Sequence, residues 1–300
     1  MCLLVSPSVF AAGSDQPSPS TGETTSAVIG GSVVPEGKWR DVVLVVSAES
    51  TCTGTLIAPD IVLTAAHCLE GEPYEVWTDT VDYATPRGDR IKVKSYRAYP
   101  DWESKYDIGV IMLDHVARGK PRMIAPACAA KQGLREGAML HLVGFGLQSE
   151  MADSNTQMHE VDVRVVDPNC TSDDSCQQTI APHGEFVAGG GGTGSCFGDS
   201  GGPVFLPTLD GPALVGVVSR GLAIPGAACS DGGVYVRADK VVSWLQSVTG
   251  VDFDPSTCDV PADDGGEAEP ETAGCSAGSG GAGLLIGLVG IALLRRRRAA

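Results

Sequence analysis

Three short stretches of the sequence carry side chains that could act together as a nucleophile, a base and an orienting acid. Ser200 lies in Gly-Asp-Ser-Gly-Gly-Pro, and His67 lies much earlier, in Thr-Ala-Ala-His-Cys. Asp107 comes between them, at the start of the apolar run Asp-Ile-Gly-Val-Ile-Met-Leu. A glycine-flanked serine is common in turns, and a histidine after small apolar residues is usually part of a core. The three stretches together favour chemistry at an acyl group.

Each of the three side chains has a defined task in such chemistry. A serine hydroxyl is a weak nucleophile until a neighbouring base accepts its proton. His67 could accept and return that proton, because the unperturbed pKa of histidine lies close to neutral pH. A buried Asp107 would bind the other ring nitrogen and stabilise the imidazolium. In a sharp glycine turn, the backbone N–H groups of Gly198 and Ser200 would point at one spot and stabilise an oxyanion there.

The three motifs and their order resemble the chymotrypsin/trypsin family of serine endopeptidases, over roughly residues 28 to 250. The order His, Asp, Ser excludes subtilisin-like enzymes, which run Asp, His, Ser, and α/β-hydrolases, which run Ser, Asp, His. The resemblance implies that His67, Asp107 and Ser200 are catalytic. It also implies a protein or peptide substrate, an acyl-enzyme, and no cofactor.

The start of the matching region resembles the first residues of a mature enzyme of this family. In Val28-Ile29-Gly30-Gly31, cleavage just before Val28 would free an amine that turns inward and pairs with Asp199. The chain would then be a zymogen that needs an activating protease. Because Ala27 precedes the cut, that protease is not expected to prefer Arg or Lys.

Four small residues match positions of the family's substrate pocket. Gly194, six residues before the nucleophile, lies where the pocket floor is expected, and Gly221 and Gly233 match its walls. A floor without an anion gives no partner to a buried Arg or Lys, so we expect apolar or aromatic residues at the cleaved position. Ser219 matches the family serine that binds the buried aspartate. Arg220 stands where the family more often has an aromatic residue.

The rest of the sequence predicts an all-β fold. Short runs of Val, Ile, Leu and Thr broken by Gly and Pro, such as residues 41–46, 61–64 and 214–218, are typical of antiparallel strands. One helix is predicted at residues 239–248, with Asp239 as its N-cap. The resemblance implies two packed antiparallel six-stranded Greek-key barrels, near 28–135 and 136–250, closed by that C-terminal helix.

Ten cysteines in an acidic chain favour an oxidising compartment. The resemblance implies the disulfides Cys52–Cys68 and Cys196–Cys229. Spacing cannot fix connectivity, but Cys170–Cys176 could close a local loop and Cys128–Cys258 could tie the first barrel to the residues after the helix. Val187 stands where the family usually has a cysteine, so the pairing of Cys170 departs from the common pattern. Cys2 and Cys275 fall in the segments that we interpret as targeting signals.

Metal and nucleic-acid binding are not expected. No cysteine pair has the C-x₂-C spacing of a zinc site, and the other histidines form no ligand pattern. Glu70, Glu72 and Glu75 could hold calcium, but such a cluster is more often a solvated turn. The net charge of −16 would repel phosphates.

Both ends of the chain carry signals for export. Residues 1–12 resemble a partial signal peptide, and residues 13–27, rich in Ser, Thr, Pro and Gly, are typical of a propeptide. Residues 251–274 form a linker with eight acidic residues and no basic one. Residues 275–300 contain a short apolar run and four arginines and resemble a bacterial MYXO-CTERM sorting tail, with a plain membrane anchor as the alternative. We therefore expect a secreted or surface-displayed protein that contacts a membrane or sorting machinery.

Two other functions remain open. A relative without catalytic activity could serve as a surface-binding module, although none of the three motifs is damaged. An esterase could use the same nucleophile, base and acid on a different acyl substrate.

Overall fold

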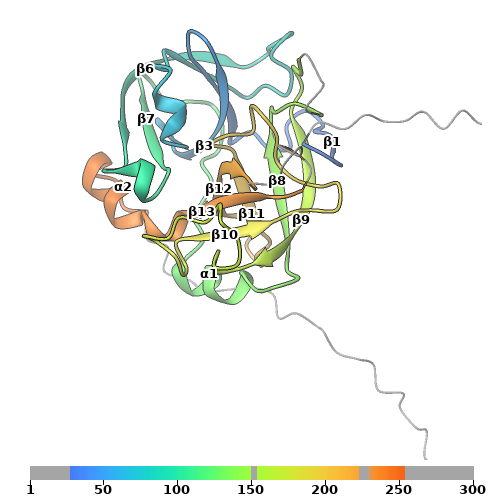
Figure 1. Ribbon diagram of the computed structural model, residues 1–300. Coiled ribbons are helices and arrows are strands. Elements are labelled where there is room, and N and C mark those ends of the chain that lie inside the picture. Colours follow the sequence, from blue (N-terminus) through green and yellow to red (C-terminus); the bar gives the residue numbers. More distant parts are fainter. Residues whose placement is uncertain (1–27, 150–153, 223–228, 230, 254–300) are drawn as a thin grey trace, which may run out of the picture. The chain divides into compact units, whose positions relative to one another are not determined.

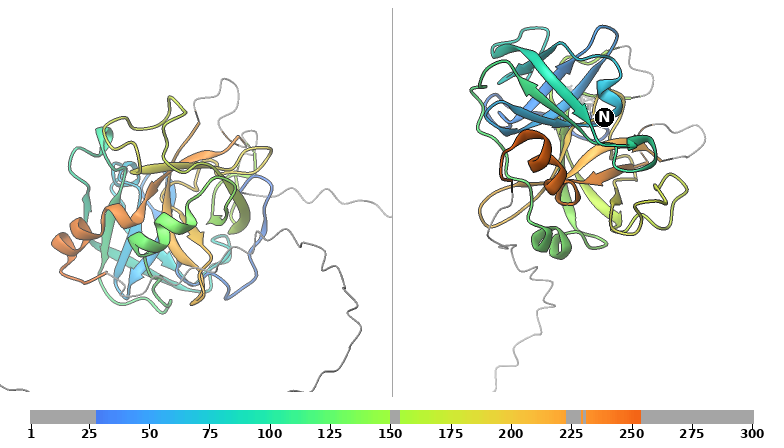
Figure 2. Two further views of the ribbon diagram at one scale, coloured as in Figure 1. Left: turned by 90° about the horizontal axis from the view of Figure 1, so that it is seen from below. Right: turned by 90° about the vertical axis from the view of Figure 1, so that its left-hand side faces the viewer.

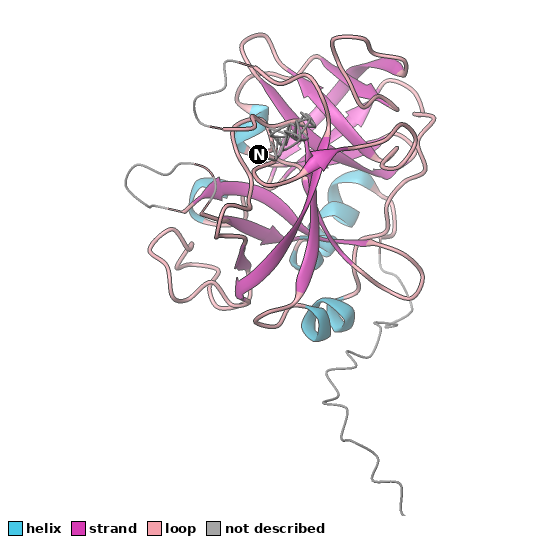
Figure 3. Ribbon diagram, turned by 90° about the vertical axis from the view of Figure 1, so that its right-hand side faces the viewer, coloured by secondary structure: helices cyan, strands magenta, loops and turns pink. Residues whose placement is uncertain are grey.

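Strands are the predominant regular secondary structure of the described residues, as the alternation of short apolar runs and turn residues predicts (Figure 3). The computed structural model describes residues 28–149, 154–222, 229 and 231–253. These residues belong to one unit, Met1–Pro261, and a second unit, Ala262–Ala300, lies outside the described residues. The expected signal peptide, propeptide and sorting tail also lie outside them.

Six antiparallel strands of the N-terminal half close into a barrel (Figure 1). Around the barrel the order is β2 (Val42–Val46), β3 (Thr51–Ala58), β4 (Ile61–Thr64), β7 (Gly109–Leu113), β6 (Asp89–Ala98) and β5 (Glu75–Thr78). Each neighbouring pair is antiparallel.

The C-terminal half forms a second ring of antiparallel strands. Its order is β9 (His159–Asp167), β10 (Glu185–Ala188), β13 (Gly233–Arg237), β12 (Ala213–Gly221), β11 (Pro203–Leu206) and β8 (Met139–Gly144), and β8 pairs back to β9 to close it. The right-hand view of Figure 2 separates the first barrel, coloured blue to teal, from the second, coloured green to orange. The predicted all-β class with two six-stranded barrels is confirmed.

The position of the N-terminal segment differs from the expected boundary. The two-residue strand β1 (Ser32–Val33) pairs with β9 of the second ring, and Ile29 forms a bridge with Gly194. The described segment before β2 therefore pairs with the second barrel, and the chain joins the first barrel at β2. Segments this short carry no periodicity, so their partner cannot be read from the sequence.

The strand β2 shows why these barrels need continuous apolar runs. All five of its residues are buried, although a strand alternates its faces. Val43 and Val45 pack in the interior of the first barrel, whereas Val42, Leu44 and Val46 pack in a separate core. That second core draws on both barrels, so it joins them.

Helices are few and short. The structure has an α-helix α1 (Ala127–Gly133), which the sequence did not lead us to expect, and the C-terminal helix α2 (Val242–Thr249). Leu245 of α2 is fully buried in the core shared by the barrels, and the Trp244 ring lies 5.2 Å from that of Tyr99. The last helix therefore packs against the first barrel. None of the helices among the described residues is long and apolar enough to cross a bilayer.

The predicted N-cap of the C-terminal helix is wrong. The residue before α2 is Val241, which makes no side-chain cap, and a short 3₁₀ turn, Ala238–Lys240, precedes it. Asp239 instead accepts two hydrogen bonds from the Arg237 guanidinium, at 2.9 and 2.8 Å. A nearby buried arginine therefore binds this carboxylate in place of the helix N-terminus.

Candidate active site

His67 lies just after strand β4, at the start of the 3₁₀ turn His67–Leu69. The two alanines before it are buried, and Gly109 lies so close to Ala65 that an added Cβ would be 3.0 Å from the Ala65 carbonyl oxygen. The Cys52–Cys68 disulfide fixes the next residue to strand β3. The small residues allow tight packing of the backbone, and the imidazole is left partly exposed, at 31%.

Asp107 binds His67 through both of its carboxylate oxygens. Asp107 Oδ1 accepts a hydrogen bond from the His67 backbone N–H at 3.0 Å, and Oδ2 lies 2.8 Å from His67 Nδ1. The Ser219 hydroxyl also donates to Oδ2, at 2.7 Å. Burial alone would raise the pKa of Asp107, but the hydrogen bonds from His67 and Ser219 outweigh it and hold the pKa below its usual value. Asp107 therefore stays ionised and directs Nε2 of the ring away from itself.

Ser200 lies in a tight turn between Cys196 and strand β11. Gly198 and Gly201 on either side have φ values of +97° and +77°, which favour glycine. A Cβ on Gly201 would come within 2.5 Å of the Thr53 carbonyl oxygen. The Ser200 carbonyl accepts a hydrogen bond from the Thr53 N–H at 2.9 Å. The turn is thereby attached to the first barrel.

His67 and Ser200 line one cleft of about 520 Å³. No hydrogen bond joins the Ser200 hydroxyl to the His67 ring among the residues that the structure describes. Such bonds are often long in unliganded enzymes and tighten when substrate binds. The arrangement can take a proton from an alcohol and hold the resulting imidazolium against a carboxylate.

The peptide bond before Gly198 is oriented by a hydrogen bond to its carbonyl oxygen. The Phe197 carbonyl accepts a hydrogen bond from the Leu147 N–H at 2.7 Å. Because N–H and C=O point in opposite directions in a trans peptide, the Gly198 N–H faces away from Leu147. Within the described chain, neither this N–H nor that of Ser200 donates to a protein acceptor. Two donors are thus available beside the hydroxyl.

Thr53 is a residue of the site that sequence reasoning missed. Its hydroxyl donates to the Gly198 carbonyl at 2.8 Å and accepts from the Phe145 N–H at 3.1 Å. A buried threonine in a strand is ordinary, so no sequence pattern identifies it. Only the packing of β3 against the Ser200 turn reveals its contacts.

Asp199, the neighbour of Ser200, is fully buried. Its carboxylate accepts hydrogen bonds from the Gly146 N–H at 2.8 Å and the Cys196 N–H at 2.9 Å. Burial raises its pKa to about 7, against the lowering effect of these two bonds. Val28 is also fully buried and has a φ of +46°, an unusual angle for a β-branched residue.

The expected pocket residues lie in two groups. Ser219 and Gly221 line the cleft together with Ser195. Gly194 and Gly233 do not line that cleft in the described part of the chain. A Cβ on Gly233 would lie 2.8 Å from Ser195 Oγ, and one on Gly194 would lie 3.2 Å from the Gly232 N. Residues 223–228 and 230 lie outside the described residues.

Three disulfides join pairs of described cysteines: Cys52–Cys68, Cys170–Cys176 and Cys196–Cys229. Cys128 is also disulfide-bonded. Cys258, its expected partner, lies outside the described residues, as do Cys2 and Cys275.

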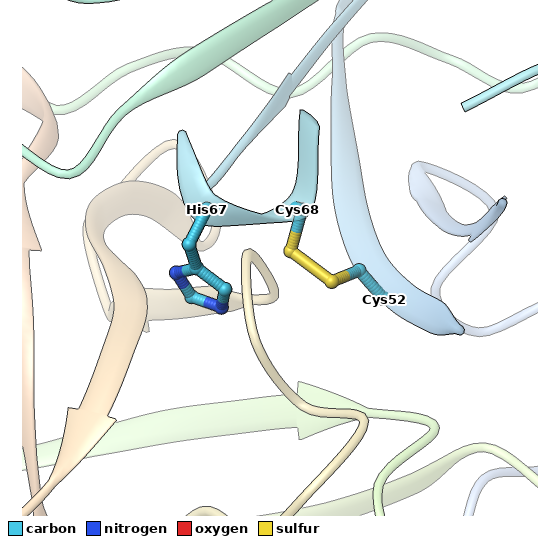
Figure 4. Close-up of side chains that lie close together, drawn as sticks. All are labelled: Cys52, His67 and Cys68. Atoms are coloured by element: carbon cyan, nitrogen blue, oxygen red, sulfur yellow. A yellow bond between two sulfur atoms is a disulfide. The ribbon is translucent and has the colours of Figure 1, made fainter. Parts of the chain in front are cut away.

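One cluster near the cleft has the composition of a metal site. Cys52, His67 and Cys68 offer ligand atoms within 4.8 Å of one another (Figure 4). The two sulfur atoms are bonded to each other, however, at 2.02 Å. A disulfide has no thiolate to offer a metal. The Cys52–Cys68 bond instead links the turn that carries His67 to strand β3.

Comparison with known proteins gives consistent matches over the described chain. The family model "Trypsin" matches residues 28–245. Coagulation factor XII of Sus scrofa is 30% identical over 246 residues, which cover 74% of this chain and 39% of that protein. Serine protease 56 of Homo sapiens is 30% identical over 76% of this chain and 40% of its own length. Glucanase inhibitor protein 3 of Phytophthora infestans is 29% identical over 74% of this chain and 88% of its own length.

The chain thus spans about two fifths of the factor XII relatives that it matches. The family model covers both barrels, the His67 turn, Asp107 and the Ser200 turn. On this match and on its two-barrel fold, the chain belongs to the trypsin family.

Proposed function

We propose that this chain is a serine endopeptidase, made as an inactive precursor, that hydrolyses peptide bonds through an acyl-enzyme. One observation carries the proposal: His67 is held by Asp107 at 2.8 Å and lines the same cleft as Ser200. Membership of the trypsin family supports it.

The reaction follows from the positions of these groups. Ser200 Oγ attacks the carbonyl carbon of the substrate peptide while its proton passes to His67 Nε2. The negative charge that develops on the carbonyl oxygen is stabilised by the N–H groups of Gly198 and Ser200. The carbon–nitrogen bond then breaks, and His67 gives the proton to the leaving amine. A water molecule, deprotonated by His67, then attacks the ester carbonyl. The ester bond breaks, and His67 returns the proton to Ser200 Oγ.

Activation by cleavage before Val28 is the second part of the proposal. Its support is the burial of both partners: Val28 and Asp199 are fully buried, and Ile29 pairs with Gly194 in the segment that leads to Asp199. A buried carboxylate is unfavourable without a cation. The amine released by cutting after Ala27 would supply that cation and fix the turn that carries the two N–H donors.

The preferred residue at the cleaved position is expected to be apolar or aromatic. Gly221 lines the cleft without a side chain, and Gly194, which matches the family's pocket floor but does not line the described cleft, carries no anion. Phe197 at the rim is 60% exposed and adds apolar surface. Peptide substrates that differ only at this residue test the preference, and we expect Phe or Leu to exceed Arg by at least about tenfold in kcat/KM.

The activity is tested on the full chain with a controlled cut. Ala27→Arg places a basic residue before Val28, so that immobilised trypsin can cleave there and then be removed. We expect a fluorophosphonate probe to label the cut chain strongly and the uncut chain weakly. The matched control is the same chain with Ser200→Ala, which should fold, be cut and remain unlabelled, with peptide turnover lower by roughly 10⁴-fold or more. A cut, folded chain that the probe does not label would refute the proposal.

A binding function is the second candidate. It is favoured by the match to Glucanase inhibitor protein 3, whose name describes an inhibitor and which this chain covers over 88% of its length. A folded, cut chain that resists the probe but binds a protein partner would support this alternative. Turnover of esters without turnover of peptides would instead indicate an esterase.

We further propose that the protein is secreted or displayed on the cell surface of a bacterium. The ten cysteines and the tail of residues 275–300 support this proposal. Mass spectrometry of the protein from its native host tests it, because the mass fixes both mature ends and any lipid at Cys275. A full-length chain recovered from the cytosol with reduced cysteines would contradict it.

A further inference from the structure

Arg220 lies at the edge of the cleft, beside Ser219, and its guanidinium is engaged on every side. An arginine has five N–H donors. Nε donates to the Ser175 carbonyl at 2.8 Å, and one Nη2 donor reaches the same oxygen at 2.5 Å. Nη1 and Nη2 donate to the two oxygens of Glu185, both at 2.8 Å. The remaining Nη1 donor binds Ser219 Oγ at 2.9 Å.

All five donors of Arg220 are therefore used within the protein, and its ion pair with Glu185 is hard to break. The Glu185 side chain is completely buried and also accepts a hydrogen bond from the Gln177 N–H at 2.7 Å. Moving Arg220 towards a substrate carboxylate would leave Glu185 as an unpaired buried charge, which is strongly unfavourable. Arg220 is thus poorly suited to bind an acidic substrate, although it lines the cleft.

The contact with Ser219 connects this ion pair to the catalytic groups. A serine hydroxyl has one proton to donate and two lone pairs that accept. Because a cationic N–H occupies the acceptor side of Ser219 Oγ, the hydroxyl proton is directed at Asp107 Oδ2, 2.7 Å away. The positive charge also polarises the hydroxyl and strengthens that bond.

We propose that Arg220 is a positioning residue of the active site. It orients Ser219 so that the Ser219 hydroxyl holds Asp107, which in turn holds the His67 ring. The inference rests on the proposed peptidase function, and it adds to that function a residue that stands where the family more often has an aromatic side chain.

The loop that carries Ser175 completes this network. The Cys170–Cys176 disulfide closes the loop just beside Ser175. Two residues later, Gln177 Nε2 donates to the Glu103 carbonyl at 2.9 Å, close to Asp107 in the first barrel. The local disulfide and Arg220 both depart from the family pattern, and they meet in one set of contacts. The loop holds the ion pair, and the ion pair holds Ser219.

A double-mutant cycle tests the route through Ser219. In the cut full chain, Arg220→Met should lower kcat about tenfold while KM stays within about twofold, for peptides with acidic, neutral or basic flanking residues alike. Introduced into a Ser219→Ala chain, the same change should lower kcat by less than about threefold, because the group through which it acts is gone. Arg220→Lys keeps the charge but loses the planar guanidinium that binds Glu185 through two hydrogen bonds, so its kcat should lie between those of the parent and Arg220→Met.

The pH profile separates orientation from charge. Arg220→Met leaves the Glu185 carboxylate unpaired, so the acid limb of kcat/KM should move to higher pH by roughly half a unit. The Arg220→Met, Glu185→Gln chain removes both charges; its acid limb should return to the parent position while kcat stays low. Glu103 and Lys105 are exposed and line a second cleft, of about 320 Å³, together with His67, Asp107 and Arg220. Asp173 accepts a hydrogen bond from the Ser175 N–H, and Arg237 and Asp239, like Glu185, are close enough to Tyr106 to affect its pKa. They are unchanged in all variants.

Arg122 provides the matched control. It also forms a two-bond pair with a buried carboxylate, that of Asp41, and lines neither cleft beside His67 in the described chain. Arg122→Met should lower stability but leave kcat and its pH profile unchanged. The inference would be overturned if Arg220→Met raised KM for acidic peptides alone. It would also be overturned if Arg220→Met lowered kcat by the same factor in the parent chain and in the Ser219→Ala chain. If the parent chain itself is inactive after cutting, the proposed function fails instead.

Discussion

At the scale of single residues, Asp199 is the group whose charge state should change most between the precursor and the cut chain. In the uncut chain its fully buried carboxyl has a pKa raised from 3.8 to about 7. An unfolded chain releases this proton near pH 4, so the folded state binds more protons between about pH 4 and pH 7. The free energy of unfolding therefore falls as the pH rises through that window, and by about 4 kcal/mol in total from this group.

We predict that Asp199→Asn removes this dependence, because an amide does not titrate. In uncut chains carrying Ser200→Ala, the parent should lose roughly 2–4 kcal/mol more stability than Asp199→Asn between pH 5 and pH 8. Urea unfolding at the two pH values measures the difference. After the cut before Val28, the new amine should supply a cation, and the difference should shrink. The same pH dependence in both uncut chains would contradict the assignment.

The sequence could indicate the three proposed catalytic residues because their neighbours are unusual: alanines before His67, glycines around Ser200 and an apolar run after Asp107. It could flag Arg220 only as a departure from a pattern. Its main partner, Glu185, lies 35 residues away in another strand. No local signal joins two residues at that distance, so the contact needed the fold.

At the scale of elements, strand β3 holds the turn that carries Ser200. Thr53 of β3 binds the Gly198 carbonyl, the Phe145 N–H and, through its own N–H, the Ser200 carbonyl. Two residues along the same strand, Thr55 is equally buried, but its hydroxyl has no hydrogen-bond partner among the described residues. The two threonines form a matched pair.

We predict that Thr53→Val lowers kcat about tenfold or more, because the oxyanion turn loses its anchor at the Gly198 carbonyl. Thr55→Val should leave kcat unchanged and keep or slightly raise the melting temperature, since it removes an unsatisfied buried hydroxyl. Steady-state kinetics and thermal unfolding of the two variants provide the test. Equal effects on kcat would show that burial, and not the hydrogen bonds, matters.

Element boundaries were predictable only where the apolar pattern is long. The predicted run at 41–46 contains β2, which begins at Val42, and the run at 61–64 coincides with β4. The helix α1 was missed because it follows a proline and is only 7 residues long, too short to show a period. Asp239 looked like an N-cap, yet Arg237, two residues away, binds it instead. The Arg237 guanidinium and the helix N-terminus compete for the Asp239 carboxylate. Which of them binds it depends on the geometry of the fold, which the sequence does not show.

At the scale of the whole described unit, one arginine joins the two barrels. Arg122, in the segment between them, binds both oxygens of Asp41 at 2.7 and 2.8 Å and the Pro212 carbonyl at 2.9 Å. Asp41 precedes β2 of the first barrel, and Pro212 precedes β12 of the second. The guanidinium also lies 4.9 Å from the centre of the Phe205 ring. The Asp41 side chain is 3% exposed, so its charge depends on this partner.

We predict that Asp41→Asn lowers the free energy of unfolding by about 3–5 kcal/mol, because it leaves Arg122 as an uncompensated, mostly buried cation. The matched control is Asp79→Asn, which breaks a similar two-bond pair with Arg40 on the surface and should change stability only slightly. Urea unfolding of the two variants measures both values. Similar losses in the two would show that the Arg122 pair is not a clamp between the barrels.

The angle at Val28 has a consequence for the direction of activation. Its φ of +46° is defined by the peptide bond to Ala27, and such an angle in a β-branched residue stores about 1–3 kcal/mol. Hydrolysis of that bond abolishes the torsion, and the stored energy is released with it. Rejoining the ends would have to restore the angle and withdraw a charged amine from Asp199. The cut before Val28 would therefore be favoured over its reversal.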